Sequence, residues 1–481
     1  MLFNSLEYLI FLPVVLILFF ITTHRFRWVI LLVASYYFYM SWNPTYLGLI
    51  LFSTLIDYIA GRKIASSQKA FTRKAFLVLS LTVNLGLLFF YKYFNFVSSE
   101  VIKVSHLLGY NTGSYIHQFI LPVGISFYTF QTMSYTIDVY NGKTKPEKHL
   151  GVFAVFVSFF PQLVAGPIER AGHLIHQLRE NKVIYFRNFQ FGLIRILWGL
   201  LKKVVIADRL AIMVNTVYNS PDNFAGWQLI FATIFFAFQI YCDFSGYSDI
   251  AIGTARLFGV RLMENFRTPY LSHSIGEFWH RWHISLSTWF RDYLYIPLGG
   301  SRVVKWRWYY NLFITFVISG FWHGANWTFL MWGAIHGGIL VGENMLKQNK
   351  LNLQHFPTFF KPVKVFWIFC LACFAWIFFR ANSITDAFTI IKNMTNFSQP
   401  LADNLRGQIL YLGQPLWRFA GSIFLIVSLI SLEVLINKKK ISEIHLIKQK
   451  TFIRWSIYCL LVTIILMFGV FELDEFIYFQ F

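Results

Sequence analysis

His323 is an ionisable residue inside a long uncharged apolar segment. Residues 311–342 read NLFITFVISGFWHGANWTFLMWGAIHGGILVG and contain no Lys, Arg, Asp or Glu. A charged group at membrane depth costs about 2.5–3.5 kcal/mol, so ionisable residues there are rare and usually face a cavity. Histidine can enter in its neutral form, and that form accepts a proton near neutral pH. His323 is therefore a candidate general base. The alternative is a structural histidine that is hydrogen-bonded inside a helix bundle.

Two predictions concern the surroundings of His323. In a helix that continues past it, Asn326 and Trp327 fall on the same side. Gly320 and Gly324 flank the histidine and would let a substrate or another helix approach closely. His336 follows in the same apolar segment.

A second group of histidines lies in residues 266–302, FRTPYLSHSIGEFWHRWHISLSTWFRDYLYIPLGGSR. Residues 276–294 lack proline, which predicts one helix that ends before Pro297. Its His280 and His283 would share a face, and Arg281 and Asp292 would share another. Tryptophans such as Trp282 suit a membrane interface or a groove wall, so an amphipathic interfacial helix is the alternative. Two histidines without a third ligand nearby do not predict a metal site.

The segment 239–253, QIYCDFSGYSDIAIG, begins in an apolar run and then becomes polar. Asp243 and Ser245 precede Gly246, and Ser248 and Asp249 follow it. Polar, glycine-broken backbone at membrane depth is tolerated only where protein or water surrounds it. The segment therefore predicts either a broken or re-entrant helix that lines a cavity, or an interfacial turn.

The composition indicates the kind of element that must position these side chains. Of the 481 residues, 56% are hydrophobic and 13% are charged, against about 25% charged in soluble domains. We predict an all-α, polytopic membrane protein with about eleven spanning helices plus short or re-entrant ones, since about 20 apolar residues cross a bilayer. The apolar runs lie near 8–23, 28–42, 45–60, 75–91, 150–166, 226–242, 308–320, 325–342, 365–379, 419–436 and 455–471, with weaker ones near 116–140 and 189–207. One membrane domain would occupy residues 1–481, with a catalytic core at roughly 120–390.

The net charge of +20 arises from 42 basic and 22 acidic residues. The basic residues gather in short loops near positions 24–27, 62–74, 143–148 and 438–450, which the positive-inside rule places in the cytoplasm. That orientation leaves both termini outside the cytoplasm. Without a basic–aromatic soluble module, the charge does not predict nucleic-acid binding.

Three stretches resemble the membrane-bound O-acyltransferase family: QIYCDFSGYSDIAIG, FWHRWHISLSTWFRDYLYIPLGG and SGFWHGANWTFLMWGAIHG. They look most like the bacterial branch that includes alginate O-acetyltransferases. FFPQLVAGPIER at 159–170 and WIFFRANS at 376–383 agree with it. The resemblance implies many helices around a central tunnel, with re-entrant helices near its middle.

The resemblance also implies roles for single residues. His323 matches the family's defining histidine, His283 matches a second histidine near the tunnel, and His336 resembles a further recurring histidine. We expect the tunnel to be lined by substrate-contacting residues, namely Asp243, Ser245, His280, Trp282, Arg291, Asp292, Asn326, Trp327 and His336.

The implied reaction moves an acetyl group from a cytoplasmic thioester, acetyl-CoA or another, to an extracytoplasmic polysaccharide such as alginate, with no bound cofactor. An extracytoplasmic partner of the serine-hydrolase (SGNH) type would receive the acyl group, and the protein would lie in the bacterial cytoplasmic (inner) membrane, in contact with membrane lipid. D-alanyl transfer to teichoic acid is one alternative. A transporter or channel without acyl chemistry is another, because intramembrane histidines also suit a proton relay.

Overall fold

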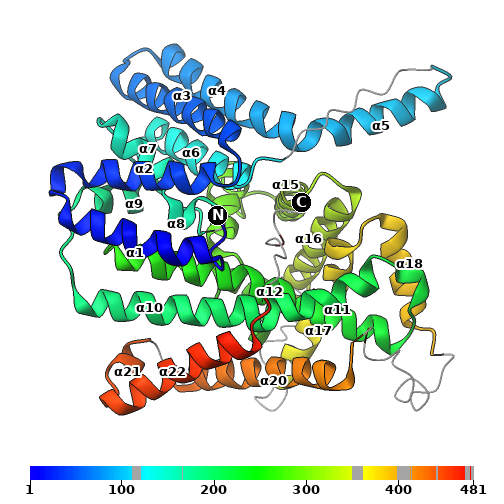
Figure 1. The fold of residues 1–481 in the computed structure, drawn as a ribbon. Helices are drawn as coiled ribbons and strands as arrows, with labels where there is room; N and C mark the ends of the chain where they lie inside the picture. The colour runs from blue at the N-terminus through cyan, green and yellow to red at the C-terminus, as the bar shows by residue number, and fades with distance from the viewer. Residues whose placement is uncertain are drawn as a thin grey trace. The chain divides into compact units, whose positions relative to one another are not determined.

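The computed structural model describes residues 1–110, 121–164, 166–348, 361–397, 412, 414–439, 443–471 and 477. In these residues the regular secondary structure is entirely helical (Figure 1). The all-α prediction is confirmed. Most of the C-terminal tail, which we expect outside the cytoplasm, lies outside the described residues.

The contacts between residues divide the chain into two compact units. Unit 1 comprises residues 1–196 and 250–263, and unit 2 comprises residues 197–249 and 264–481. The single membrane domain over 1–481, with its core at 120–390, stays a prediction.

Unit 1 is built from helices that pack through small and polar side chains as well as apolar ones. In its interior, the buried Asp57 carboxylate accepts hydrogen bonds from Ser80 (2.5 Å) and Asn84 (3.0 and 2.9 Å). Buried polar groups need such partners, because an unsatisfied one is costly. The helices are α1 (Leu6–Ile21), α2 (Arg27–Met40), α3 (Leu47–Ser66), α4 (Ala70–Leu88), α5 (Phe94–Leu107), α6 (Ile125–Tyr140), α7 (Leu150–Ser158), α8 (Phe160–Leu163), α9 (Ala171–Arg179) and most of α10 (Phe186–Leu200), with short turns η1 (His24–Phe26) and η2 (Pro44–Tyr46) and the π-helix η3 (Phe89–Tyr93).

Unit 2 holds both groups of candidate histidines. Its helices are η4 (Leu201–Ala207), α11 (Asp208–Tyr218), η5 (Pro221–Asn223), α12 (Trp227–Leu257, whose last turns belong to unit 1), η6 (Pro269–Leu271), α13 (Ile275–Arg281), α14 (Ile284–Phe290), η7 (Arg291–Tyr295), α15 (Lys305–His323), α16 (Trp327–Gln348), α17 (Lys361–Arg380), α18 (Ile384–Met394), α20 (Leu416–Lys439), α21 (Glu443–Ile447) and α22 (Thr451–Phe468). Segments η4 and η7 are π-helices, a form that is frequent at functional sites.

Six helical segments of the described chain are long and apolar enough to cross a membrane. They are Pro44–Ser66, Ala70–Leu107, Trp227–Leu257, Lys361–Arg380, Leu416–Lys439 and Thr451–Phe468. Burial separates them: the most apolar part of Trp227–Leu257 is 83% buried, whereas that of Thr451–Phe468 is 6% buried. Helix α12 is therefore an internal helix, and α22 presents nearly all of its apolar side chains outward. The multi-pass architecture is confirmed, while the count of eleven spans and the orientation stay predictions.

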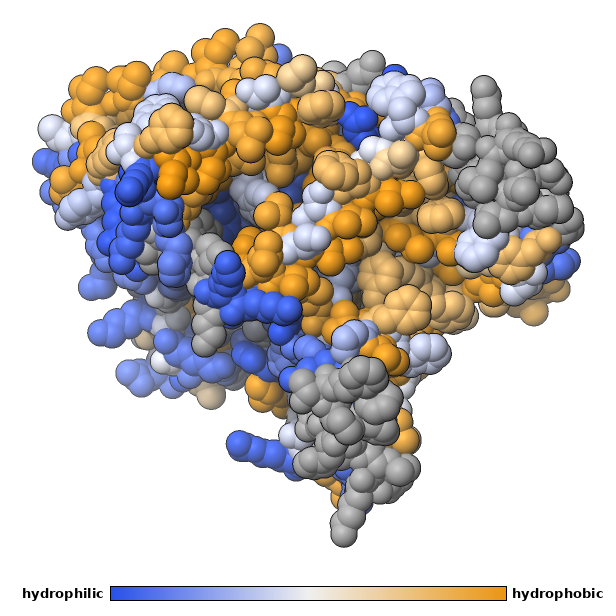
Figure 2. Space-filling model, turned by 90° about the horizontal axis from the view of Figure 1, so that it is seen from below, coloured by the Kyte–Doolittle hydropathy of each residue, from blue (hydrophilic) through white to orange (hydrophobic). Residues whose placement is uncertain are grey.

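Outward-facing apolar side chains are abundant in the described residues. Leu6, Phe71, Phe424 and Leu466 are each more than two-thirds exposed. Figure 2 shows hydrophobic residues over much of the face that it presents, with hydrophilic ones gathered toward one side. Exposed apolar surface on this scale requires a lipid environment rather than water.

The predictions of a broken helix or an interfacial turn at Gly246 are both wrong, because α12 continues through this residue from Trp227 to Leu257. Gly246 serves close packing instead: a Cβ there would lie 2.8 Å from the carbonyl oxygen of Gly199. The polar side chains around it are buried against two lysines of η4, which are described below.

Candidate active site

His323 and His283 lie close together in the interior of unit 2. Their imidazole centroids are 6.3 Å apart, with an angle of 50° between the ring planes. His323 is 3% exposed and His283 is fully buried. The fold thus brings together the two histidines that the family resemblance singled out, from different helical segments.

His323 is the last residue of α15, and the prediction that the helix continues beyond it is wrong. Gly324 adopts an extended conformation (φ −160°, ψ 148°), and α16 begins at Trp327. A Cβ on Gly324 would lie 2.0 Å from the Phe329 ring, and one on Gly320 would lie 2.2 Å from the Phe329 carbonyl oxygen. The two glycines therefore admit a neighbouring helix, which was one of their two predicted uses, and they fix His323 at the turn between α15 and α16.

His283 lies between two short helices, so the prediction of one helix over 276–294 is also wrong. Its backbone is left-handed (φ 43°, ψ 54°), a conformation that costs a non-glycine residue about 1–3 kcal/mol. Helix α13, capped by Ser274, ends just before it and α14 begins just after it. The predicted faces, His280 with His283 and Arg281 with Asp292, therefore do not hold, because the helix is interrupted at His283.

Asn265 holds this strained junction in place. Its carbonyl oxygen accepts the Ile284 N–H (2.9 Å), and its side-chain Oδ1 accepts both the N–H (3.2 Å) and the hydroxyl (2.9 Å) of Ser285. Its Nδ2 donates to Ser248 of α12 (3.2 Å). Asn265 is 1% exposed and ties the start of α14 to α12, so it positions the backbone on which His283 stands. Nothing in its local sequence pattern signals this role.

Aromatic rings enclose both imidazoles. Around His323 lie Trp322, Trp332 and Phe379, at centroid distances of 5.0, 5.1 and 5.4 Å. Phe244 lies 4.5 Å from His283 in an edge-on arrangement. Rings packed this closely leave little room for bulk water beside either imidazole, and a neutral imidazole can accept a proton.

His336 occupies a neighbouring aromatic enclosure. Trp332 and Trp279 both lie 5.0 Å from its ring, and Phe278 stacks on it with planes 3° apart. In the described part of the chain neither ring nitrogen of this fully buried histidine has a hydrogen-bond partner. His336 and His323 share Trp332 as a neighbour.

Asp243 and Ser245 belong to a buried network of ions. Lys203 pairs with Asp243 (2.8 Å) and Asp208 (2.7 Å). Lys202 donates to Ser245 (2.9 Å) and pairs with Asp249. The backbone N–H of Ile477 also donates to Asp243 (2.9 Å). Phe244, which follows Asp243 in the chain, connects this network to the pair through its contact with the His283 ring at 4.5 Å. The predicted substrate contact of Asp243 and Ser245 stays a prediction.

The other predicted lining residues range from buried to exposed. Trp282 is buried and packs on Trp376 at 5.0 Å, one layer from the histidine pair. His280 and Arg291 are exposed, Arg291 pairs with Asp292 (2.8 Å), and Trp327 is 52% exposed. Asn326 accepts the Thr328 N–H (3.0 Å) at the start of α16 and donates to the Asn382 carbonyl (3.2 Å).

The comparisons with known proteins point to one family. Residues 147–385 match the family model of membrane-bound O-acyltransferases, a range that contains both histidines of the pair. The chain is 41% identical to the probable alginate O-acetylase of Pseudomonas putida, over 82% of this chain and 81% of that protein. This chain belongs to the membrane-bound O-acyltransferase family.

Two further relatives indicate the breadth of the family around this chain. The peptidoglycan O-acetyltransferase of Helicobacter pylori is 36% identical over 76% of this chain and 73% of its own length. The teichoic acid D-alanyltransferase of Streptococcus thermophilus is 29% identical over 57% of this chain and 69% of its own length.

The segment WIFFRANS, noted above only as a resemblance, has a structural role in this O-acyltransferase. Arg380 is 8% exposed and donates to Asn215 (2.8 Å), Asn219 (3.2 Å) and Asn382 (3.3 Å). Since Asn382 in turn accepts from Asn326, the guanidinium supports the turn that follows His323. The signal available in the sequence was an arginine at the end of an apolar run with no acidic residue beside it.

Proposed function

We propose that this O-acyltransferase takes an acetyl group from a cytoplasmic thioester and passes it to a hydroxyl outside the cytoplasm. That acetyl group ends on an extracytoplasmic polysaccharide, either directly or through a partner protein. The observation that carries the proposal is the buried pair of His323 and His283 inside the family-matched range. The similarity to an alginate O-acetylase and a peptidoglycan O-acetyltransferase supports an acetyl group as the cargo and a polysaccharide as its destination.

His323 acts in this scheme as the general base. It takes the proton of the acceptor hydroxyl as that oxygen attacks the thioester carbonyl, and the tetrahedral intermediate then collapses with loss of the thiolate. The proton held by His323 passes to the departing thiolate, so the histidine returns to its neutral form. General-base catalysis of this kind contributes about 10²–10⁴-fold in rate.

His283 supplies a hydrogen bond to the oxyanion of the intermediate. A donor held in a water-excluded site is worth more than one in water, because it needs no reorganisation during the reaction. The strained backbone at His283 and its support by Asn265 are consistent with a side chain held for such a task. The aromatic enclosure also protects the thioester from hydrolysis.

The remaining parts of the proposal concern the donor, the partner and the location. Acetyl-CoA or another acyl thioester is the donor and acts as a substrate, with no bound cofactor in the scheme. A serine-hydrolase (SGNH) type protein outside the cytoplasm accepts the acyl group and modifies the glycan. The chain lies in the bacterial cytoplasmic (inner) membrane, with both termini outside the cytoplasm.

The test is mass spectrometry of the purified glycan from cells that carry His323→Ala. We expect O-acetyl groups to be lost while the protein is still inserted at wild-type amounts. His176→Ala is the matched control, because His176 is exposed in α9 of unit 1 and should leave acetylation intact. Wild-type acetylation in the His323→Ala strain would contradict the general-base role.

D-alanyl transfer is the second candidate, favoured by the similarity to teichoic acid D-alanyltransferases. The same mass spectra separate the two, because a D-alanyl ester and an acetyl ester differ in mass. Reconstitution of the purified protein with acetyl-CoA, with and without the proposed partner, then tests whether the glycan or the partner is the immediate acceptor.

A further inference from the structure

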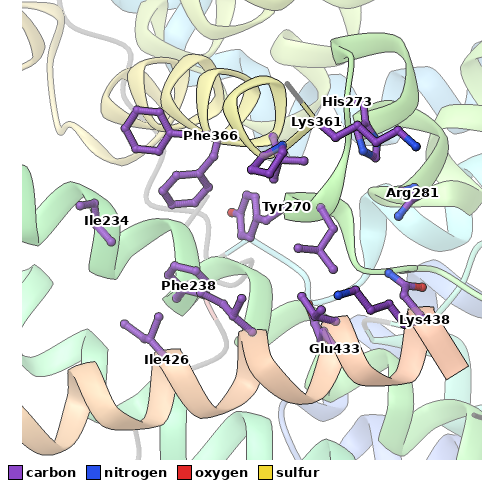
Figure 3. A pocket seen from close by; sticks show the side chains of 17 residues that line it. Ile234, Phe238, Tyr270, His273, Arg281, Lys361, Phe366, Ile426, Glu433 and Lys438 are labelled. Carbon is purple, nitrogen blue, oxygen red and sulfur yellow. The ribbon is translucent and has the colours of Figure 1, made fainter. Parts of the chain in front are cut away.

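A groove of about 870 Å³ lies in unit 2, between helices α12, α17 and α20 and the segment that precedes α13 (Figure 3). This volume falls within the range of about 300–1,000 Å³ that is usual for small-molecule sites. The wall includes Tyr270, which accepts a hydrogen bond from Trp376 Nε1 (3.1 Å). Because Trp376 packs on Phe379, which packs on His323, the groove is separated from the proposed reaction site by a layer of aromatic side chains.

One part of the groove is apolar and belongs to membrane-spanning helices. Figure 3 shows Ile234 and Phe238 of α12, Phe366 of α17 and Ile426 of α20 grouped at one end. All three helices are among the six candidate spans. Phe366 is 65% exposed, so the groove is open at its side. In a bilayer, an open apolar groove between spanning helices is in contact with lipid acyl chains.

The other end of the groove is basic. Arg281, Lys361 and Lys438 line it, and Figure 3 places them on the side opposite Ile234. Arg281 pairs with Glu277 (2.6 Å), whereas Lys361 and Lys438 make no ion pair with any described residue. The one carboxylate in the wall, that of Glu433, accepts a hydrogen bond from the buried Tyr241 hydroxyl. Lys361 and Lys438 thus outnumber the Glu433 carboxylate, so this end of the groove keeps a net positive charge that attracts an anion.

We infer that this groove binds an anionic phospholipid. Its acyl chains would lie along α12, α17 and α20, and its phosphate would lie between Lys361 and Lys438. The segregation of apolar and basic side chains along one groove matches the two halves of such a lipid, and basic pockets between transmembrane helices are a known form of lipid recognition. The site goes beyond the proposed acyl transfer, and it holds whether or not that proposal does.

The test uses the purified full-length protein in detergent and native mass spectrometry with phosphatidylglycerol and with phosphatidylcholine. We expect phosphatidylglycerol to bind more tightly. In Lys361→Gln/Lys438→Gln its affinity should fall about 25-fold, since one lysine near an anionic lipid contributes about a fivefold effect. The matched control is Lys305→Gln/Lys392→Gln, which removes the same charge from exposed positions outside the groove and should bind like the wild type.

Several outcomes would overturn the inference. Equal affinity for the two lipids, or equal loss in the control variant, would remove the anion specificity. Displacement of phosphatidylglycerol by inorganic phosphate at similar concentration would reduce the groove to a phosphate site. One-for-one displacement by coenzyme A would assign the groove to the acyl donor instead of a lipid.

Discussion

The imidazoles of His323 and His283 lie 6.3 Å apart, yet their backbones are held in place by different kinds of contact. His323 is held by close packing at the turn between α15 and α16, where glycines admit the neighbouring helix. His283 is held by hydrogen bonds that Asn265 accepts from the two residues after it, Ile284 and Ser285. A substitution that disturbs either the helix packing or the hydrogen bonds should move one histidine relative to the other and leave both imidazoles chemically unchanged.

Asn265→Ala tests the hydrogen bonds that support the backbone at His283. The change removes the side-chain oxygen that accepts the Ser285 hydroxyl and N–H, and each lost hydrogen bond costs about 0.5–1.5 kcal/mol. We expect a lower thermal unfolding midpoint and a lower kcat, with KM for the donor thioester little changed. Ser248→Ala, which removes only the contact to α12, should have a smaller effect on both. A variant that loses stability but keeps its kcat would limit Asn265 to a purely structural role.

Gly320→Ala tests the close packing beneath His323. The new Cβ would lie 2.2 Å from the Phe329 carbonyl oxygen, and overpacking of this kind typically costs about 1–3 kcal/mol. We expect a lower unfolding midpoint and reduced acyl transfer. Gly338→Ala in α16 is the matched control, because a Cβ there meets nothing within 4 Å and alanine favours a helix over glycine by about 0.5–1 kcal/mol. If both variants behave alike, the interhelical contact is not what positions His323.

Lys203→Met tests the buried ion network next to Phe244. The change leaves both Asp208 and Asp243 without their shared cation, and removal of one partner of a buried pair costs about 3–5 kcal/mol. Asp208→Asn should cost less, because Lys203 keeps its pair with Asp243. Thermal unfolding of the purified variants measures the difference, and a Lys203→Met protein as stable as Asp208→Asn would contradict this account.

The composition and apolar runs predicted the helical class and the multi-pass membrane architecture, and the family resemblance singled out the two histidines that lie together. The local sequence pattern did not predict correctly where helices break and where they continue. Polar residues around Gly246 predicted a break, yet the lysines of η4, distant in sequence from Asp249, satisfy them inside a continuous helix. The absence of proline predicted one helix through His283, but tertiary hydrogen bonds from Asn265 stabilise a left-handed residue there. Such partners come from other segments, so local periodicity carries no trace of them.

His173 of α9 provides a test by pH in unit 1. Its Nδ1 lies 2.6 Å from the Glu169 carboxylate, and this hydrogen bond raises the pKa of His173 above its usual value of 6.5. A raised pKa means that the folded state holds the proton more tightly, so the stabilisation is fully present below pH 6.5 and is lost as the pH rises through the folded-state pKa. We therefore expect the difference in unfolding midpoint between the wild type and His173→Asn to shrink as the pH rises from roughly 6 to 9. This range brackets a histidine pKa that is raised above its usual value. A difference that stays constant or grows with rising pH would contradict the charged pairing of His173 with Glu169.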